Sequence, residues 1–227
     1  VVAAITQPGF AELVKESAPD IRFLVITDNN AGDKAKTPDS VPHIPFAELL
    51  GDKGACPVRA TDPHANLGIQ FTSGTTSRPK AVLWTHANTI WGAQMNASHM
   101  RLSGADITLA FLPLFHTNAQ SYSMLGSLWV GGTIVVQPRF SASRFWPTAR
   151  KHKCTWTSLI PFCVKALLSQ DPPPDHSFRF WNPAIRMPDV ETTYGIPTFG
   201  WWGMTETITH GIVGDIDHPG GPLSIGR

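Results

Sequence analysis

Residues 67–84 have the sequence LGIQFTSGTTSRPKAVLW, in which a polar run separates two short apolar segments. Residues 67–71 and 81–84 are apolar runs of the length that strands usually have. Between them, residues 72–80 include five hydroxyl side chains, one glycine and two cations. The stretch therefore predicts a strand, a polar loop and a second strand.

The composition of this loop suits a phosphate group. Hydroxyl and backbone N–H groups donate hydrogen bonds to phosphate oxygens, and a glycine lets the backbone approach closely. A lysine adds a point charge, and the proline before it stiffens the chain. We therefore predict that the loop binds phosphate through Thr72, Ser73, Gly74, Thr75, Thr76 and Lys80. A solvated turn rich in Ser and Thr is the alternative that this composition leaves open.

The loop is not a Walker P-loop, which requires the pattern G-x-x-x-x-G-K-S/T followed by a helix. Here Pro79 precedes Lys80, and Ala81 stands where a hydroxyl residue would be needed. The next element is predicted to be a strand. A nucleotide would be held by loop groups and Lys80 rather than by a helix dipole, which argues against a kinase-like or GTPase-like protein.

The remainder of the chain alternates between strand-like and helix-like segments. Strands are predicted at residues 21–26, 107–112, 133–136 and 155–159, and helices at residues 10–18, 87–100, 121–129, 143–152 and 164–169. Thr85 is predicted to cap the helix at 87–100, and a serine the helix at 143–152. Residues 28–43 predict an exposed loop. This alternation is typical of an α/β fold with a mainly parallel sheet and flanking helices.

Composition excludes several classes of protein. The 227 residues are 42% hydrophobic and 15% charged, as in a globular protein, and the formal net charge of +1 favours neither nucleic acid nor an acidic membrane. Three cysteines without a CxxC spacing argue against a disulfide framework or a zinc site, and they fit a cytoplasmic location. The longest uncharged run, residues 107–138, is interrupted by polar residues and proline, so no integral membrane segment is predicted.

The loop closely resembles the signature loop of the adenylate-forming superfamily, the AMP-dependent synthetases and ligases that include acyl-CoA synthetases. Ser77 replaces the usual glycine of that signature, and Ala81 replaces its trailing glycine. The first change resembles the carnitine/crotonobetaine–CoA ligase branch, close to the long-chain fatty-acid–CoA ligases. The resemblance implies that the loop wraps the β- and γ-phosphates of ATP and moves during catalysis.

Three further segments resemble the same family in the same order. Residues 113–116 (PLFH) are similar to a segment whose histidine, here His116, lies near the acyl and CoA tunnels. Residues 202–206 (WGMTE) resemble the Y-G-x-T-E motif, and residues 224–227 (SIGR) a motif that follows it. The resemblance implies that Trp202 stacks on adenine, that Thr205 contacts the phosphate that becomes AMP, and that Glu206 holds Mg²⁺.

The chemistry of these residues agrees with those roles, although each has an ordinary alternative. An indole offers a flat face to a purine, but a single Trp is more often core packing. A carboxylate is a hard ligand for Mg²⁺, which often takes one or two carboxylates plus phosphates, yet a Thr–Glu pair more often caps a helix or faces solvent. His116 fits a loop histidine as well as a ligand contact. The acidic and histidine residues at 210–218 match no standard zinc spacing, so we predict no metal there.

The chain also departs from the family. Where the family has a G-G-A-P-L segment that contacts adenine, residues 180–186 are FWNPAIR. Residues 1–227 hold no counterpart of the family's ribose-binding T-G-D motif, its hinge or its mobile C-terminal domain with the catalytic lysine. We therefore expect residues 1–227 to be an incomplete part of the large N-terminal AMP-binding domain, with little or no turnover by themselves.

The expected function is that of an acid–thiol ligase of the AMP-forming acyl-CoA synthetase type. A carboxylate attacks the α-phosphate of ATP·Mg²⁺ to give acyl-AMP and pyrophosphate, and the thiol of coenzyme A then displaces AMP. The expected partners are a small-molecule carboxylic acid, ATP and CoA, without nucleic acid. The alternatives are a non-catalytic or degenerate nucleotide-binding protein, the adenylation module of a peptide synthetase, and a luciferase-like oxygenase. Neither the acid nor the oligomeric state follows from the sequence.

Overall fold

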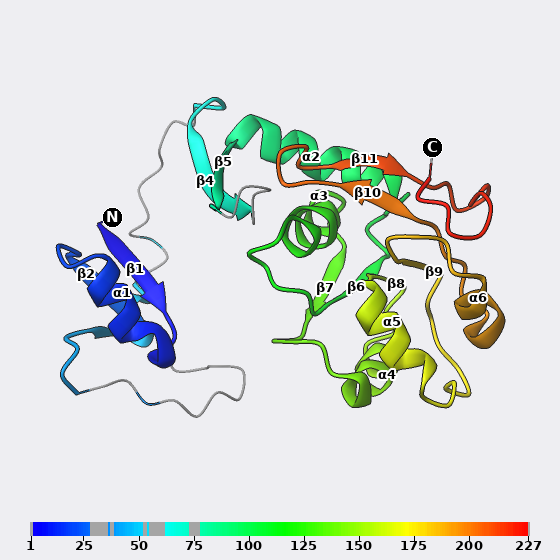
Figure 1. Cartoon of the computed structure of the whole chain (residues 1–227), viewed down its shortest axis with the longest axis horizontal. Helices are drawn as coiled ribbons and strands as arrows, with labels where there is room; N and C mark the ends of the chain where they lie inside the picture. The colour runs from blue at the N-terminus through cyan, green and yellow to red at the C-terminus, as the bar shows by residue number, and fades with distance from the viewer. Residues whose placement is uncertain are drawn as a thin grey trace. The chain divides into compact units, whose positions relative to one another are not determined.

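A computed structural model describes residues 2–27, 36, 39–51, 54, 62–72 and 78–226. Contacts divide the chain into two compact units, Val1–Ala60 and Thr61–Arg227. Figure 1 shows the elements of each unit, which we describe separately. The predicted loop at 28–43 and Cys56 lie wholly or largely outside the described residues.

The first unit is a small parallel sheet with a helical crossover. Strands β1 (Ala3–Thr6), β2 (Phe23–Ile26) and β3 (Ile44–Pro45) lie in the order β1-β2-β3, and neighbours pair parallel. A 3-10 turn η1 (Pro8–Phe10) and helix α1 (Ala11–Ser17) connect β1 with β2, and η2 (Phe46–Leu49) follows β3. Ala11, Leu24, Ile26 and Val41 are buried together as its core.

The second unit begins with an antiparallel hairpin and a long helix. Strand β4 (Asn66–Thr72) pairs with β5 (Lys80–Thr85), and α2 (His86–His99) follows directly. Thr85 caps this helix as predicted, because its hydroxyl accepts a hydrogen bond from the Asn88 N–H while the Asn88 side chain accepts one from the Thr85 N–H. The chain thus turns directly from the hairpin into α2.

A four-stranded parallel sheet forms the centre of the second unit. Its order is β7-β6-β8-β9, with β6 at Ile107–Ala110, β7 at Thr133–Val136, β8 at Trp156–Ser158 and β9 at Phe180–Asn182. The connections contain a π-helix η4 (Asn118–Leu125) that runs into α3 (Gly126–Trp129), then α4 (Ala142–Lys151) and α5 (Pro161–Leu168). Helix α6 (Pro188–Tyr194) follows β9. The predicted parallel α/β architecture is confirmed.

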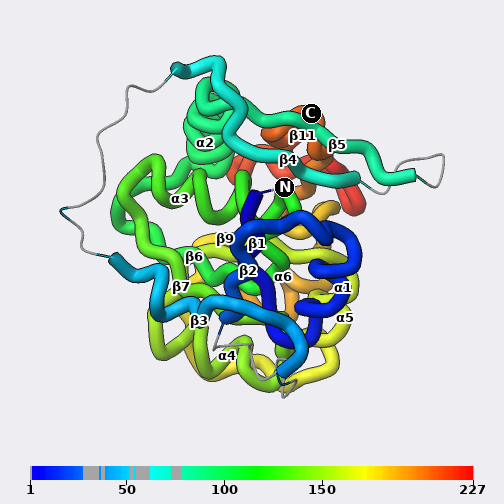
Figure 2. The backbone as a smooth tube through the Cα atoms, turned by 90° about the vertical axis from the view of Figure 1, so that its left-hand side faces the viewer, coloured from blue at the N-terminus to red at the C-terminus, as the bar shows by residue number. Residues whose placement is uncertain are grey.

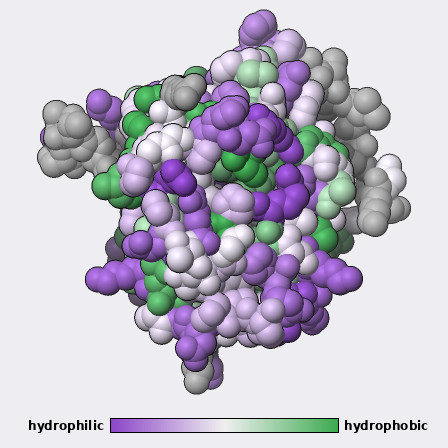
Figure 3. Space-filling view, turned by 90° about the vertical axis from the view of Figure 1, so that its right-hand side faces the viewer, coloured by the Kyte–Doolittle hydropathy of each residue, from purple (hydrophilic) through white to green (hydrophobic). Residues whose placement is uncertain are grey.

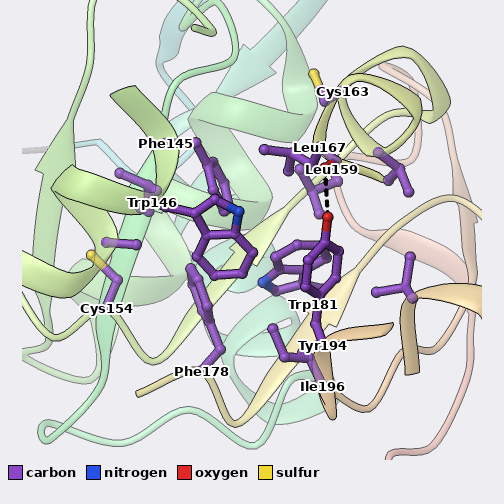
Figure 4. Packing of buried hydrophobic residues seen from close by; sticks show 14 of the residues in the cluster. Phe145, Trp146, Cys154, Leu159, Cys163, Leu167, Phe178, Trp181, Tyr194 and Ile196 are labelled. Carbon is purple, nitrogen blue, oxygen red and sulfur yellow. Dashed lines mark hydrogen bonds between the residues drawn. The ribbon is translucent and has the colours of Figure 1, made fainter. Parts of the chain in front are cut away.

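The two faces of this sheet bury different aromatic residues, because side chains alternate along a strand. Trp181 of β9 belongs to the larger core with Phe145, Trp146 and Tyr194 from α4 and α6 (Figure 4). Phe180, the residue before it, belongs to a second cluster with Trp156, Met100 and Phe199. The Tyr194 hydroxyl donates to the Leu167 carbonyl of α5 at 2.5 Å, which joins α6 to α5.

After α6 the chain forms a second antiparallel hairpin, β10 (Trp201–Gly203) and β11 (His210–Val213). Both ribbon views show β11 beside α2 (Figures 1 and 2). Helix α2 follows the first hairpin directly and also contacts β11 of the second hairpin, so both hairpins pack against the same helix. Neither β9 nor this second hairpin was predicted from the sequence.

Two of the predicted helices differ from the structure. The helix predicted at 121–129 is a π-helix over its first part, which the spacing of apolar residues does not reveal. The predicted serine cap at 143–152 is wrong: Ser141 occupies the N-cap of α4 without a capping hydrogen bond from its side chain, and its hydroxyl lies 3.2 Å from that of Ser143.

The face in Figure 3 is mostly hydrophilic, with smaller separate hydrophobic areas among its coloured atoms. Within the described part of the chain, each helix is too short or too polar to cross a membrane.

Candidate functional site

The β4–β5 hairpin carries the predicted phosphate loop. Thr72 and Lys80 are register partners at the end of the hairpin where the connecting loop begins and ends, so the structure confirms the two predicted strands on either side of it. Lys80 and Arg78 are exposed, and Thr72 is half-buried. The predicted binding residues Ser73, Gly74, Thr75 and Thr76 lie outside the described residues.

Trp202 lies on β10 with an open indole. The side chain is 46% exposed. Gly211, the bulged residue of β11, lies under the ring: a Cβ on Gly211 would be 3.0 and 3.1 Å from two indole carbons. Any side chain at position 211 would press on the ring. Trp202 therefore presents an aromatic ring that is about half exposed and packs against Gly211.

Close packing explains why the WGMTE segment has a glycine at position 203. A Cβ on Gly203 would lie 2.2 Å from the Tyr122 hydroxyl oxygen and 3.0 Å from the Thr209 carbonyl. Tyr122 belongs to η4 and is only 2% exposed. The π-helix thus packs directly against the backbone of β10, and only glycine fits between them.

The turn after β10 presents Thr205 and Glu206. The Glu206 side chain is exposed and Thr205 is half-buried. The Thr207 hydroxyl lies 2.9 Å from the Met204 carbonyl and 2.8 Å from the Thr209 carbonyl. Its hydrogen bonding therefore links the beginning of the turn to its end. A carboxylate free to reach solvent suits a cation that also binds phosphates.

A single side chain joins the two predicted nucleotide motifs. The indole N–H of Trp84, which is buried on β5, donates to the Thr205 carbonyl at 3.1 Å. The hairpin is held a second time where the amide of Gln70 on β4 donates to the side chain of Gln120 on η4. The phosphate-loop hairpin and the Thr205 turn are therefore neighbours, although more than a hundred residues separate them.

His116 follows Phe115, which lines an apolar cavity; the resemblance implied tunnels near this histidine, but the sequence did not name the lining residues. The histidine is exposed between β6 and η4, and its ring centroid is 4.6 Å from that of Phe115. The cavity has a volume of about 580 Å³ and lies beyond the carboxyl ends of β6 and β7. Its apolar lining includes Phe111, Leu114, Phe115, Val136, Phe140 and Phe162. Apolar residues that follow successive parallel strands are the signal that would have located it.

Residues 180–186, whose sequence departs from the family, lie next to β10. The Trp201 N–H donates to the Ala184 carbonyl at 3.1 Å, and the Trp201 indole N–H donates to the Asn182 carbonyl at 3.1 Å. Arg186 instead pairs with Glu191 of α6 at 2.8 Å. Residues 182–184 thus flank β10, although their sequence differs from the G-G-A-P-L segment.

Several titratable groups are held in one charge state by burial or by an ion-pair partner. Burial, and secondarily the charge of His99, lower the pKa of His210 to about 3, so His210 is neutral at physiological pH. Burial also raises the pKa of Cys154 and Cys163 to about 11, and neither thiol is ionised at neutral pH. Of the residues at 210–218, Asp215 and Asp217 form ion pairs with Arg101.

Comparison with known proteins identifies the family. The model of the AMP-binding enzyme family matches residues 3–227, so the chain belongs to this family. The resemblance found in the sequence is thereby confirmed.

Within this family, the chain is similar to curated CoA ligases. The chain is 32% identical to the crotonobetaine/carnitine–CoA ligase of Citrobacter koseri, over 94% of this chain and 44% of that protein. It is 31% identical to the enzyme of the same name from Salmonella typhi, over 95% of this chain and 42% of that protein. The chain thus spans less than half the length of these relatives.

Solved structures share the fold. An anthranilate–CoA ligase in complex with anthranoyl-AMP matches with a TM-score of 0.80 at 18% identity, over 99% of this chain and 45% of that one. The O-succinylbenzoate coenzyme A synthetase of Bacillus subtilis, in complex with ATP and magnesium, matches with a TM-score of 0.68 at 24% identity, over 98% of this chain and 55% of that one.

Proposed function

We propose that this chain belongs to an ATP-dependent carboxylic acid–CoA ligase. In the first half-reaction a carboxylate oxygen attacks the α-phosphorus of ATP, and the bond to pyrophosphate breaks, which gives acyl-AMP. In the second, the sulfur of CoA attacks the acyl carbon, AMP leaves, and the thiol proton is released. Membership of the AMP-binding enzyme family and the names of the curated relatives support this reaction.

The observation that carries the proposal is the hydrogen bond from Trp84 to the Thr205 carbonyl. It joins the β-hairpin whose loop would bind the β- and γ-phosphates to the turn whose residues would meet the α-phosphate and the metal. One nucleotide spans both motifs only if they are neighbours, and this bond makes them so.

Each residue then has a distinct task. Lys80, with the loop hydroxyls, neutralises charge on the departing pyrophosphate, Trp202 supports the adenine, and Thr205 donates to the α-phosphate. Glu206 fits Mg²⁺ as a single exposed carboxylate, since this ion commonly completes its shell with phosphate oxygens and water. When bound, Mg²⁺ supplies neutralisation of the phosphate charge. The chain needs no covalent nucleophile, because positioning and charge neutralisation carry the reaction.

The apolar cavity beside His116 supports a substrate with an apolar part. Its lining suits the chain of a carboxylic acid, and its exposed aromatic ring at Phe115 also suits a trimethylammonium group through a cation–π contact. We propose His116 as a contact of the acid or of the CoA arm at its edge. The proposal also places the enzyme in the cytoplasm, where ATP and CoA are supplied.

Nucleotide binding by the 227-residue chain tests the site. Isothermal calorimetry with MgATP should show binding that falls at least about tenfold in Lys80→Ala and in Glu206→Gln, because each change removes a charge beside the phosphates. Lys165→Ala and Glu16→Gln remove exposed charges of the same kind elsewhere and should bind normally. Equal affinity in all four variants would refute the assignment of these two residues.

Pyrophosphate exchange tests the chemistry. Incorporation of labelled pyrophosphate into ATP should depend on a carboxylic acid, measured on the protein as its source organism makes it with a panel that includes fatty acids and trimethylammonium acids. Transfer of the acyl group to free CoA supports the ligase, whereas transfer only to a carrier protein indicates a peptide-synthetase module. Nucleotide binding without exchange for any acid would point to a non-catalytic protein.

A further inference from the structure

The turn that carries Thr205 and Glu206 ends in an unfavourable backbone conformation. Ile208 has a φ of +59°, in the left-handed region that β-branched residues rarely adopt. The residue is 3% exposed and is not at a flexible surface. A β-branched residue persists in this conformation only where its surroundings hold it there.

Two buried polar side chains hold this residue. The Ser121 hydroxyl donates to the Ile208 carbonyl at 2.7 Å, and the Asn96 amide N–H donates to the same carbonyl at 3.4 Å. Asn96 also donates to the Ser121 hydroxyl at 3.0 Å and accepts from the His210 N–H at 3.3 Å. Asn96 lies on α2 and Ser121 on η4, and both are fully buried. The end of the turn is therefore fastened to two different helices.

Packing around Ile208 leaves little room for movement. A Cβ on Gly92 of α2 would be 3.1 Å from the Ile208 side chain, so helix and turn are in close contact. At its other end, the turn is held by the Trp84 indole at the Thr205 carbonyl. Glu206 lies between these two attachments, and their geometry sets the direction in which its carboxylate points.

A pair of apolar side chains could fill the same space but would leave the Ile208 carbonyl without a partner. A buried carbonyl without a hydrogen bond is costly, so the turn would rotate to find one. Such a rotation would redirect Thr205 and Glu206 while the core stayed packed. The polar pair thus does more than fill volume.

We propose that Asn96 and Ser121 are positioning residues for the nucleotide. By holding the Ile208 carbonyl, they orient Thr205 and Glu206 toward the phosphates and Mg²⁺. The proposal rests on the proposed function, because it assigns a role within the same site. It adds residues on α2 and on the π-helix that contact neither ATP nor the metal.

The test compares two serines of one helical segment in the 227-residue chain. Ser121→Ala removes the hydroxyl that reaches the turn. Ser127→Ala is the matched control, because Ser127 is equally buried but bonds to the Ser123 carbonyl and the Thr108 hydroxyl. Calorimetry would measure the dissociation constants for MgATP and for adenosine, and urea unfolding would measure the stability of each variant.

Ser121→Ala should weaken MgATP binding about tenfold, the usual effect of removing a group that orients a ligand-binding residue. Adenosine binding should change less than about twofold, because its platform, Trp202, precedes the turn. Ser127→Ala should leave both constants unchanged at a similar loss of stability. Ser121→Cys keeps the shape with a weaker donor and should give an intermediate loss of MgATP affinity.

Two outcomes would overturn the proposal. If Ser121→Ala binds MgATP like the wild type, the turn does not need the hydroxyl. If MgATP and adenosine weaken by the same factor, the residue supports the fold in general rather than the turn. Should the wild-type chain bind no MgATP, the proposed function fails first, and this result is distinct from the other two.

Discussion

Replacing Gly203 with alanine tests whether the contact between β10 and the π-helix is as close as described. The new Cβ would lie 2.2 Å from the Tyr122 hydroxyl oxygen and 3.2 Å from its Cζ. Tyr122 cannot swing away, since it is 2% exposed and its ring packs 4.0 Å from His210 and 5.4 Å from Trp201. Overpacking of this kind costs about 1–3 kcal/mol of unfolding free energy.

A second substitution separates this clash from other causes. Tyr122→Phe removes the hydroxyl and its 3.3 Å hydrogen bond to the Thr209 carbonyl, which costs about 1 kcal/mol by itself. In the double variant the nearest clash is gone, and only contacts of 3.0 Å or more remain. The double variant should therefore be at least about 1 kcal/mol more stable than the sum of the single changes predicts.

Urea unfolding followed by circular dichroism gives the free energies of all four proteins. Gly68→Ala is the matched control, because Gly68 also lies in a strand but a Cβ there would meet no atom within 4 Å. It should change stability by less than about 0.5 kcal/mol. Additive effects of Gly203→Ala and Tyr122→Phe would show that the tyrosine hydroxyl is not what requires glycine in the WGMTE segment.

Two further predictions concern the buried titratable groups His210 and Asp106. The pKa of His210 is about 3 in the folded chain, against the ordinary 6.5. Between these two pH values the unfolded chain binds a proton at this histidine that the folded chain does not. Stability should fall as the pH drops from 6 to 4, by up to about 1.4 kcal/mol per pH unit for this group, and urea titrations of His210→Phe should show a shallower fall; equal slopes would contradict the assignment. Asp106 is 3% exposed, and hydrogen bonds from Thr155, the Ser103 N–H and Arg179 outweigh its burial and keep its pKa low. Asp106→Ala should cost about 2–3 kcal/mol of unfolding free energy, less than at a fully buried pair because Arg179 is 43% exposed. In the same urea titrations, Asp215→Ala, at an exposed pair, should destabilise the protein clearly less than Asp106→Ala.

Local sequence signals predicted the elements that depend on neighbouring residues. The strand at Thr133–Val136 and the Thr85 cap of α2 were predicted correctly, since a short apolar run and a hydroxyl before a helix act over a few residues. The two strands around the phosphate motif were predicted for the same reason. The parallel direction of the strands in the central sheet followed from the alternation of strands and helices, whereas their order did not.

Features that depend on distant residues were not predicted. The π-helix at Asn118–Leu125 has no sequence pattern of its own, and its packing of Tyr122 against Gly203 joins residues 81 positions apart. The contact of Gly211 with the Trp202 ring depends on a bulge in the partner strand. The family resemblance named Thr205 and Glu206, but nothing in the motif pointed to Asn96 and Ser121, which bond to the Ile208 carbonyl at the end of their turn.

The bonds that fasten the Thr205 turn also determine when it can form during folding. They join residues 121, 112 and 87 positions apart, from Trp84, Asn96 and Ser121 respectively. Closing a loop of 121 residues costs about 2 kcal/mol more chain entropy than closing one of about 12 residues. The turn is therefore expected to assemble after the strands and helices around it. Opening of the folded turn breaks these same long-range bonds and can be followed by native-state hydrogen exchange. A nucleotide that bridges the turn and the hairpin would slow that opening, so the amide protons of residues 205–209 would report its binding directly.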